Sequence, residues 1–199
     1  MTKIPRVLVV TGTPGVGKTH VAMTLRDRLG GRYLSLSEIV TQENLQLAVD
    51  EARDTVVADV PRLTERVHRI ISEASGDVVV ESHYAPDVVS PDVVTYVFVL
   101  RVAPDKLRQR LLERGYPEGK IRENVAAEVL DVCLVDAVAR YGEAKVDEID
   151  GTSLSVEEVV DEILKVVDGH RTTTRGAVDW LGKLEAEDRL DELAAFLEW

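Results

Sequence analysis

The chain has 199 residues, which is enough for one α/β domain with a full core and a small appendage. Apolar residues make up 45% of it and charged residues 30%, a balance that excludes disorder as the default. The formal net charge of −12 excludes non-specific binding to bare nucleic acid, but it allows a basic protein partner or life at high salt or high temperature.

The first predicted element is a strand at residues 6–10, where the apolar side chains are continuous. Such a run predicts a central parallel strand that is buried on both faces. A glycine-rich segment follows, and apolar side chains then recur at helical spacing over residues 21–29. Gly30 and Gly31 are expected to end this helix, and a short strand is expected at residues 33–36.

The next stretch predicts a helix, a polar arm and a second helix. Ser37 is expected to begin the first helix, with Glu38 in its first turn. The polar, weakly periodic residues 41–59 are predicted to form a mobile arm or loop. Apolar side chains on one face predict a helix over residues 61–74.

Strands and helices alternate through the following hundred residues or so. The expected elements are strands at residues 77–81, 93–100 and 144–149, and helices at residues 104–114, 121–141 and 156–167. This alternation predicts a three-layer α/β/α fold, in which a central parallel sheet lies between helices on both faces.

The last part of the chain looks like an addition to this core. Residues 169–176 are interpreted as a linker, and residues 177–199 are expected to form short amphipathic helices. We therefore predict a core domain at residues 1–169 and a helical extension at residues 170–199. The apolar run near the N-terminus is too short for a signal peptide or a membrane span, so a cytoplasmic protein is expected. The single cysteine, Cys133, excludes an internal disulfide and is expected to be a buried small hydrophobe.

The glycine-rich segment at residues 12–19 reads GTPGVGKT and fits the phosphate-loop pattern of Gly, any four residues, Gly, Lys and Ser or Thr. It lies between a buried strand and the start of a helix, so backbone N–H groups and the helix N-terminus would face the phosphates of ATP. Lys18 is expected to bring a positive charge to the β- and γ-phosphates, and Thr19 to offer its hydroxyl to Mg²⁺. The alternative is a glycine-rich turn that binds nothing.

The strand at residues 77–81 ends in polar side chains. It delivers Glu81, Ser82 and His83 to the carboxyl edge of the sheet, where the chemistry of parallel α/β sheets lies. Glu81 is predicted to hold Mg²⁺ through its water shell or to orient an attacking water. His83 could do the same or donate to a phosphate. The alternatives are a solvated strand end and a packed or exposed histidine.

Phosphoryl transfer builds negative charge on the moving group, so cations are needed around it. The candidates are Arg101, at the end of a strand, and Arg114, which precedes a glycine-flanked segment that could close over ATP. Arg110, Lys120 and Arg122 are weaker candidates. For all five the alternative is an ordinary surface position.

Taken together, these residues resemble the adenylate kinase isoenzyme 6 family, also called the coilin-interacting nuclear ATPase group, and in particular its archaeal members. The matching segments are GTPGVGKT at residues 12–19, VVVESH at 78–83, VLR at 99–101, LLERGY at 111–116, KI at 120–121 and ENV at 123–125. The segments after the phosphate loop are the more specific ones, because many kinases share the loop.

The resemblance covers about residues 4–168 and implies a P-loop NTPase of the nucleoside monophosphate kinase type. It implies a broad-specificity adenylate kinase that uses Mg²⁺ with ATP and also hydrolyses ATP. It also implies a part in small ribosomal subunit biogenesis and rRNA processing, through ribosomal protein uS11 and transient contact with the pre-small subunit. No membrane and no sequence-specific nucleic acid partner is expected.

The resemblance also implies roles for particular residues. The monophosphate-binding arm would lie at about residues 36–59 and the lid at about residues 113–123. The residues that would bind ATP are Gly15, Val16, Gly17, Lys18, Thr19, His20 and Arg114. The residues that would be catalytic are Lys18, Glu81, His83 and Arg114, with Thr19 and Glu81 serving the metal.

Two positions depart from the family pattern. Glu81 stands where the family has Asp and keeps the carboxylate on a longer side chain, and His20 stands where the family has a second Thr.

The leading hypothesis is a monophosphate kinase, and the alternative is an ATPase switch in ribosome assembly. A small-metabolite kinase, such as one for shikimate, ranks last, because Arg53 is the only basic residue between Arg32 and Arg62 that could bind a carboxylate.

Overall fold

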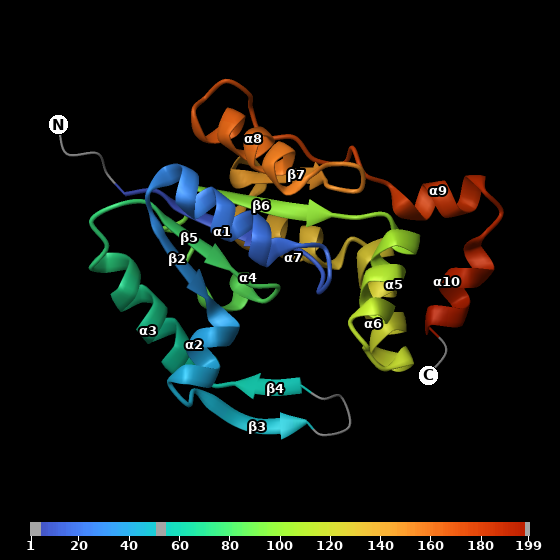
Figure 1. The fold of residues 1–199 in the computed structure, drawn as a ribbon, viewed down its shortest axis with the longest axis horizontal. Coiled ribbons are helices and arrows are strands. Elements are labelled where there is room, and N and C mark those ends of the chain that lie inside the picture. The colour runs from blue at the N-terminus through green and yellow to red at the C-terminus, as the bar shows by residue number, and fades with distance from the viewer. Residues whose placement is uncertain (1–4, 51–54, 198–199) are drawn as a thin grey trace.

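The computed structural model describes residues 5–50 and 55–197. Its centre is a five-stranded sheet in which all neighbouring strands are parallel (Figure 1). In spatial order the strands are β2 (Arg32–Ser35), β5 (Val78–Glu81), β1 (Val7–Thr11), β6 (Tyr96–Arg101) and β7 (Val146–Asp150). The parallel sheet predicted from the alternation of elements is therefore confirmed.

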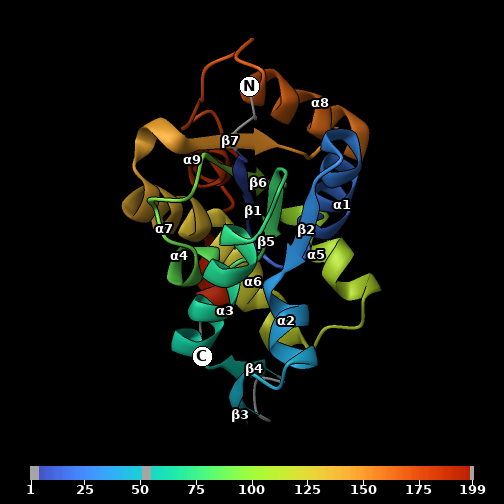
Figure 2. The same ribbon diagram turned by 90° about the vertical axis from the view of Figure 1, so that its left-hand side faces the viewer.

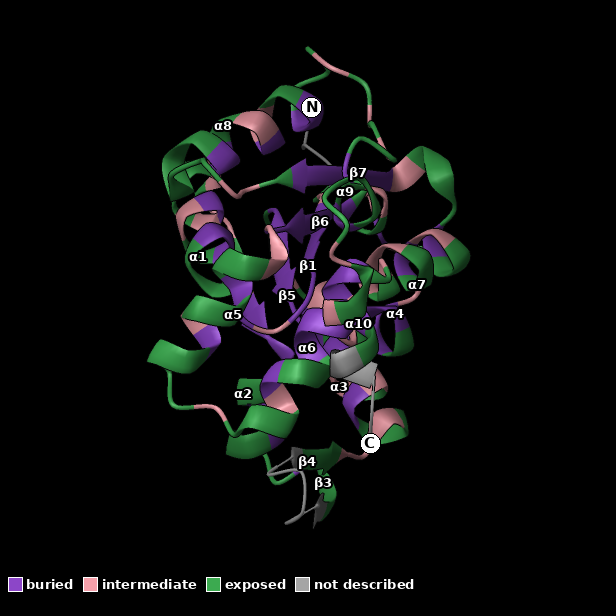
Figure 3. Ribbon diagram, turned by 90° about the vertical axis from the view of Figure 1, so that its right-hand side faces the viewer, coloured by how far each residue is buried: buried purple, intermediate pink, exposed green. Residues whose placement is uncertain are grey.

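Each face of the sheet carries its own apolar core. Along β1, Val7 and Val9 point into one core and Leu8 and Val10 into the other, which is why this strand reads as a continuous apolar run. The first core is completed by α2 (Leu36–Gln42), α3 (Val60–Ser72), α4 (Ala85–Val88) and α7 (Val132–Tyr141). The second is completed by α1 (Lys18–Leu29), α5 (Pro104–Glu113), α6 (Glu118–Val129) and α8 (Val156–Val167). Figure 3 shows the buried strands between these layers, as the three-layer prediction requires.

The order of the strands fixes where chemistry can occur. After β1 the chain passes through α1 to β2 at one edge, so the two strands beside β1, which are β5 and β6, come from later in the sequence. A crevice forms outside the carboxyl ends of parallel strands at such a switch point. The segments that follow β1, β5 and β6 therefore meet at one edge of the sheet.

One predicted helix is wrong. Residues 121–141 form two helices, α6 and α7, which meet at Asp131. The backbone of Asp131 is left-handed, with a φ of 57°, a conformation that a helix interior does not contain. Its carboxylate pairs with Arg101 on the sheet. The apolar spacing gave no sign of this break, because both helices bury apolar side chains on either side of it.

The polar arm is also more ordered than predicted. Helix α2 is capped by Ser35, whose Oγ accepts a hydrogen bond from the Glu38 N–H at 3.3 Å, so it begins before the expected Ser37. The chain then forms an antiparallel pair, β3 (Gln46–Asp50) and β4 (Thr55–Ala58). This pair projects beyond α2 (Figures 1 and 2). Leu47 in this pair is 67% exposed, so little of the pair packs on the rest of the protein.

The C-terminal segment packs on the core through two short helices, α9 (Trp180–Ala186) and α10 (Leu190–Leu197). Its apolar side chains form a third cluster with α6, made of Ala126, Val129, Val178, Trp180, Leu184 and Leu193. The residues interpreted as a linker run along β7, where Arg171 forms an ion pair with Asp147 at 2.8 Å. Within the part of the chain that the structure describes, no helix is long and apolar enough to span a membrane.

Candidate active site

The phosphate loop joins β1 to α1, as its pattern predicted. Gly12 has a φ of 134° and lies so close to β6 that a Cβ atom there would approach the carbonyl oxygen of Leu100 to 2.4 Å. Gly15 has a φ of 99°, and its Cβ would come within 2.8 Å of Leu107. Only glycine fits these conformations and contacts. The result is a tightly curled loop at the N-terminus of a helix, which is a geometry that binds anions.

Lys18 lies across this loop with only 7% of its surface exposed. Its Nζ donates to the carbonyl oxygens of Gly12 at 2.8 Å and Thr13 at 3.1 Å. Burial lowers the pKa of Lys18, while the nearby carboxylate of Glu81 opposes that change. The side chain is therefore held in place by the loop that it would serve, next to an acidic group.

Glu81 ends β5 and pairs in register with Val10 on β1, directly before the phosphate loop. Its side chain is buried, and its Oε2 accepts a hydrogen bond of 3.4 Å from the hydroxyl of Tyr33. Burial raises the pKa of Glu81, and the charge of Lys18 counteracts part of this rise. The structure thus places Glu81 near Lys18 at the edge of the sheet where the sequence predicted it, and its role there stays a prediction.

His83 follows two residues later, in the segment between β5 and α4, and is exposed. Its ring makes an edge-on contact with Tyr84, with 4.8 Å between the ring centroids. Desolvation by the surrounding protein, and then the charges of Lys18 and Lys120, lower the pKa of His83 to about 4. At neutral pH the imidazole is uncharged, so it can donate or accept a hydrogen bond but does not act as a cation.

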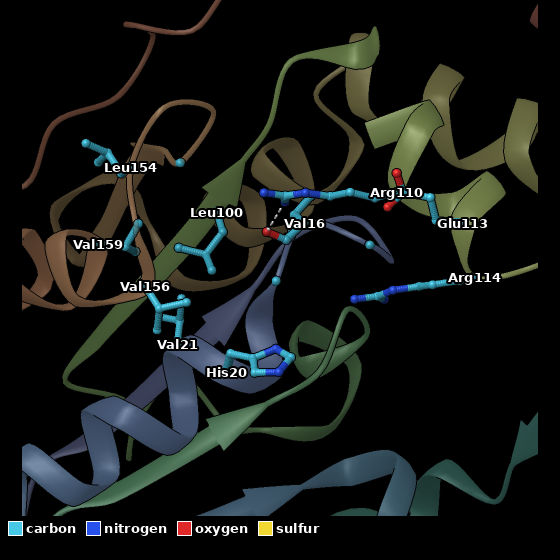
Figure 4. A pocket seen from close by; sticks show the side chains of 13 residues that line it. Val16, His20, Val21, Leu100, Arg110, Glu113, Arg114, Leu154, Val156 and Val159 are labelled. Atoms are coloured by element: carbon cyan, nitrogen blue, oxygen red, sulfur yellow. Dashed lines mark hydrogen bonds between the residues drawn. The ribbon is translucent and has the colours of Figure 1, made fainter. Parts of the chain in front are cut away.

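A cavity of about 330 Å³ extends from the phosphate loop to the segment after β7 (Figure 4). One wall is apolar and comes from β6, α1, α8 and the loop before α8, with the side chains of Leu100, Val21, Val159, Leu154 and Val156. The opposite wall carries Arg110, Glu113 and Arg114 from the end of α5. An apolar wall that faces two cations fits a flat organic group joined to phosphates.

The exposed His20 also lines this cavity, whereas Thr19, also exposed, follows Lys18 in the first turn of α1. Arg110 donates to the carbonyl oxygen of Val16 at 3.1 Å, and Figure 4 shows its guanidinium over the loop. Arg114 points into the same opening, and its charge helps to lower the pKa of Lys18. Of the residues predicted to bind ATP, Gly15, Val16, Gly17, His20 and Arg114 line this cavity, whereas Lys18 and Thr19 do not.

Arg101 is the clear failure among the predicted cations. It is 1% exposed and lies on the inner side of α6. Its guanidinium donates to Glu128 at 2.8 Å and to Glu148 at 2.6 Å, and it also pairs with Asp131. These three carboxylates more than balance its single charge, so the guanidinium of Arg101 is engaged in a buried ion network and is not directed into the cavity.

The predicted lid at residues 113–123 contains the end of α5, a turn at Gly115 and the start of α6. The Nζ of Lys120 lies over the ring of Tyr116, 5.4 Å from its centroid. The Nε of Arg122 lies 3.6 Å from the Oε1 of Glu118. Sequence reasoning underrated Arg110 and missed the apolar wall at Leu154 and Val156. The signal that could have found Leu154 and Val156 is their position just after β7, the last strand of the parallel sheet.

Comparisons with known proteins identify the family of this chain. The family model described as "AAA domain" matches residues 8–131. The protein named "Putative adenylate kinase" from Methanocaldococcus jannaschii is 38% identical over 176 residues, covering 88% of this chain and 93% of its own. The protein of the same name from Methanothermobacter thermautotrophicus is 42% identical, covering 89% of this chain and 98% of its own.

Solved structures show the same fold at low sequence identity. The shikimate kinase from Acinetobacter baumannii in complex with shikimate has a TM-score of 0.58 at 16% identity, covering 85% of this chain and 96% of its own. A gluconokinase from Sinorhizobium meliloti has a TM-score of 0.54 at 17% identity, covering 84% of this chain and 94% of its own. Identity this low speaks for the fold alone.

Proposed function

Because the chain belongs to the AAA-domain family and to the family of archaeal proteins named "Putative adenylate kinase", we propose that it transfers the γ-phosphoryl group of ATP to AMP or a related nucleoside monophosphate. The observation that carries this proposal is the buried ammonium of Lys18, bound to two carbonyls of the phosphate loop at the edge of the sheet that also holds Glu81. A single edge thus offers a cation for the phosphates and a carboxylate for the metal.

The loop would hold ATP through the backbone N–H groups of residues 15–20, aided by the N-terminus of α1. Lys18, which the carbonyl oxygens of Gly12 and Thr13 hold across the loop, would bring its ammonium group to the β- and γ-phosphates. The adenine would lie against Leu154 and Val156, with the guanidinium of Arg110 on its other side. Arg114 would then face the phosphates.

Mg²⁺ is the cofactor that this chemistry requires. The side chains in reach of the phosphates fit it, because Thr19 offers a hydroxyl and Glu81 a carboxylate, both of them oxygen donors that Mg²⁺ prefers. Thr19 would bind the ion directly and Glu81 through its water shell. The bound ion would neutralise charge on the transferred group. What the chain itself contributes is the placement of Lys18 and Arg114.

The acceptor would bind on the other side of the phosphates, between the arm at residues 36–59 and the end of β5. Helix α2 starts where β2 ends, and β2 is the neighbour of β5 in the sheet. His83 would contribute an uncharged hydrogen-bonding group here. Arg53, the one basic residue of the arm, lies outside the described residues.

The net charge of −12 supports a second function, an ATPase that switches the binding of a basic ribosomal protein such as uS11. In that case Glu81 or His83 would orient an attacking water. A pull-down of uS11 with and without Mg-ATP tests this function. Release on ATP addition supports the switch, and binding that ignores the nucleotide speaks against it.

A panel of acceptors tests the kinase proposal. The protein is incubated with Mg-ATP and with AMP, CMP, UMP or GMP, and the nucleotides are separated by anion-exchange chromatography. Shikimate and gluconate serve as control acceptors, because a shikimate kinase and a gluconokinase have the same fold as this chain. We expect a diphosphate from at least one monophosphate, formed faster than by hydrolysis of ATP alone, and no phosphorylated control. Product at the ATP-only rate throughout would refute the proposal.

A further inference from the structure

Glu128 on α6 is a buried carboxylate that accepts hydrogen bonds from four residues in three separate parts of the chain. Its Oε2 accepts from the hydroxyl of Thr13 at 2.6 Å. Its Oε1 accepts from Arg101 at 2.8 Å, from the N–H of Val102 at 3.1 Å and from the indole Nε1 of Trp180 at 3.2 Å. One side chain therefore connects the phosphate loop, β6 and the C-terminal segment.

The charges around Arg101 make the C-terminal donors important. Three carboxylates, those of Glu128, Glu148 and Asp131, surround this one guanidinium. Neutral donors must stabilise the excess negative charge, because a buried carboxylate is costly unless it is hydrogen-bonded. The C-terminal segment supplies one such donor to each of the two fully buried glutamates. These are Trp180 to Glu128, and the N–H of Gly176 to Glu148 at 2.8 Å.

The connection continues from Glu128 into the phosphate loop. Thr13 is 1% exposed, and it forms hydrogen bonds through both its hydroxyl and its carbonyl oxygen. Its hydroxyl donates to Glu128, and its carbonyl oxygen accepts the hydrogen bond from Lys18 at 3.1 Å. The carboxylate of Glu128 thus fixes the residue that holds the ammonium group. Its own orientation depends on the donors at Oε1, one of which is Trp180.

We propose that Trp180 is a positioning residue for the phosphate loop, and that it raises the affinity of the loop for nucleotide phosphates by fixing Glu128 and, through it, Thr13. This inference rests on the proposed binding of ATP at residues 12–19. It gives the C-terminal segment a function in the core site, namely to complete the support of the loop. Because such coupling is reciprocal, bound nucleotide also tightens the docking of α9.

The competing explanation is that α9 and α10 only cover apolar surface on α6. Trp180 is also part of that apolar cluster, together with Leu184 and Leu193. The two explanations differ in what the indole N–H does. Apolar covering needs the ring but no donor, whereas positioning of Glu128 needs the donor.

A double-mutant cycle separates them. Trp180→Phe keeps an aromatic ring and loses the donor, and Thr13→Val keeps the shape of the side chain and loses the hydroxyl. The dissociation constant of Mg-ATP is measured for the wild type, both single variants and the double variant. We expect Trp180→Phe to weaken binding roughly fivefold, the loss typical of one hydrogen bond, and to have no further effect once Thr13 is valine.

Leu184→Val is the matched control, because it disturbs the same apolar cluster without removing a hydrogen bond. We expect its dissociation constant to stay that of the wild type. Unchanged binding in Trp180→Phe, or an equal loss in the Thr13→Val background, would overturn the inference while leaving the proposed function intact. A wild type that does not bind Mg-ATP would refute both.

A second measurement needs no change at Trp180. The chain has two tryptophans, so Trp199→Phe leaves Trp180 as the only indole. Saturating Mg-ATP should then shift its fluorescence emission, and the shift should vanish when Thr13→Val is added. An emission spectrum that ignores nucleotide in the Trp199→Phe chain, while calorimetry reports binding, would overturn the coupling.

Discussion

The ammonium of Lys18 lies 2.8 Å from the carbonyl oxygen of Gly12, so the phosphate loop is closed by the side chain that begins the following helix. Gly12 itself is pressed against β6. The loop therefore has fixed support on both sides, and it does not have to fold around a ligand. Preorganised dipoles of this kind cost little reorganisation when charge develops on a phosphate.

The first prediction concerns the glycines of the loop. Gly12→Ala would bring a Cβ to 2.4 Å from the carbonyl oxygen of Leu100, whereas a Cβ at Gly17 meets nothing within 4 Å. Both positions have positive φ, so both variants carry backbone strain. We expect Gly12→Ala to lower the free energy of unfolding by about 2 kcal/mol more than Gly17→Ala, as measured by urea denaturation. Equal losses would show that the loop can move away from β6.

A second prediction separates Arg101 from the site. Arg101→Met leaves Glu128 and Glu148 buried without their counter-ion, so the free energy of unfolding should fall by about 3–5 kcal/mol. Arg28→Ala is the control, because its pairs with Glu157 and Asp161 are exposed and should contribute about 1 kcal/mol or less. Chemical denaturation measures both. If Arg101→Met remained as stable as the control, the buried network would have been misjudged.

The third prediction follows from the lowered pKa of His83, about 4 against an ordinary value of 6.5. At pH values between these two pKa values, His83 binds a proton in the unfolded chain but not in the folded protein. The free energy of unfolding therefore falls as the pH drops from about 6.5 to about 4. His83→Gln removes this contribution and should lose less melting temperature than the wild type between pH 7 and pH 5. If both proteins lost the same melting temperature between pH 7 and pH 5, the pKa of His83 would be that of an ordinary histidine.

A fourth prediction concerns Glu81. Its pKa is raised by burial, so the wild-type rate should fall with decreasing pH through a value above that of an ordinary glutamate. In Glu81→Gln the rate should not show this fall with decreasing pH, and activity at limiting Mg²⁺ should be roughly 10- to 100-fold lower than in the wild type. Glu81→Asp keeps the carboxylate and is expected to retain most of the activity. The readout is a pH–rate profile at several Mg²⁺ concentrations, and identical profiles for Glu81→Gln and wild type would remove Glu81 from the mechanism.

Local patterns predicted most of the sheet and the phosphate loop. The strand at β1 is recognisable because burial on both faces demands a continuous apolar run, and Lys18 is placed by the short spacing of the loop. Helix α8 begins and ends at the predicted residues. Its start is marked by a capping box in which Ser155 and Glu158 bond to each other's backbone.

The features that the sequence concealed depend on partners far along the chain. The break at Asp131 and the burial of Arg101 belong to one ion network, which joins residues about 30 positions apart. Nothing in the spacing of apolar residues announces such a pair. The donor role of Trp180 was hidden for the same reason, because its partner Glu128 lies 52 positions earlier.

The most direct test of this account is a calorimetric titration of Mg-ATP into the wild type and Lys18→Ala, with Lys145→Ala as the control. Lys145 also donates to a backbone carbonyl, that of Pro91, but belongs to the short 3-10 helix before β7. We predict binding by the wild type and the control, and binding at least about 100-fold weaker in Lys18→Ala, because a phosphate charge is left uncompensated. Equal affinities in all three proteins would contradict a phosphate site at residues 12–19.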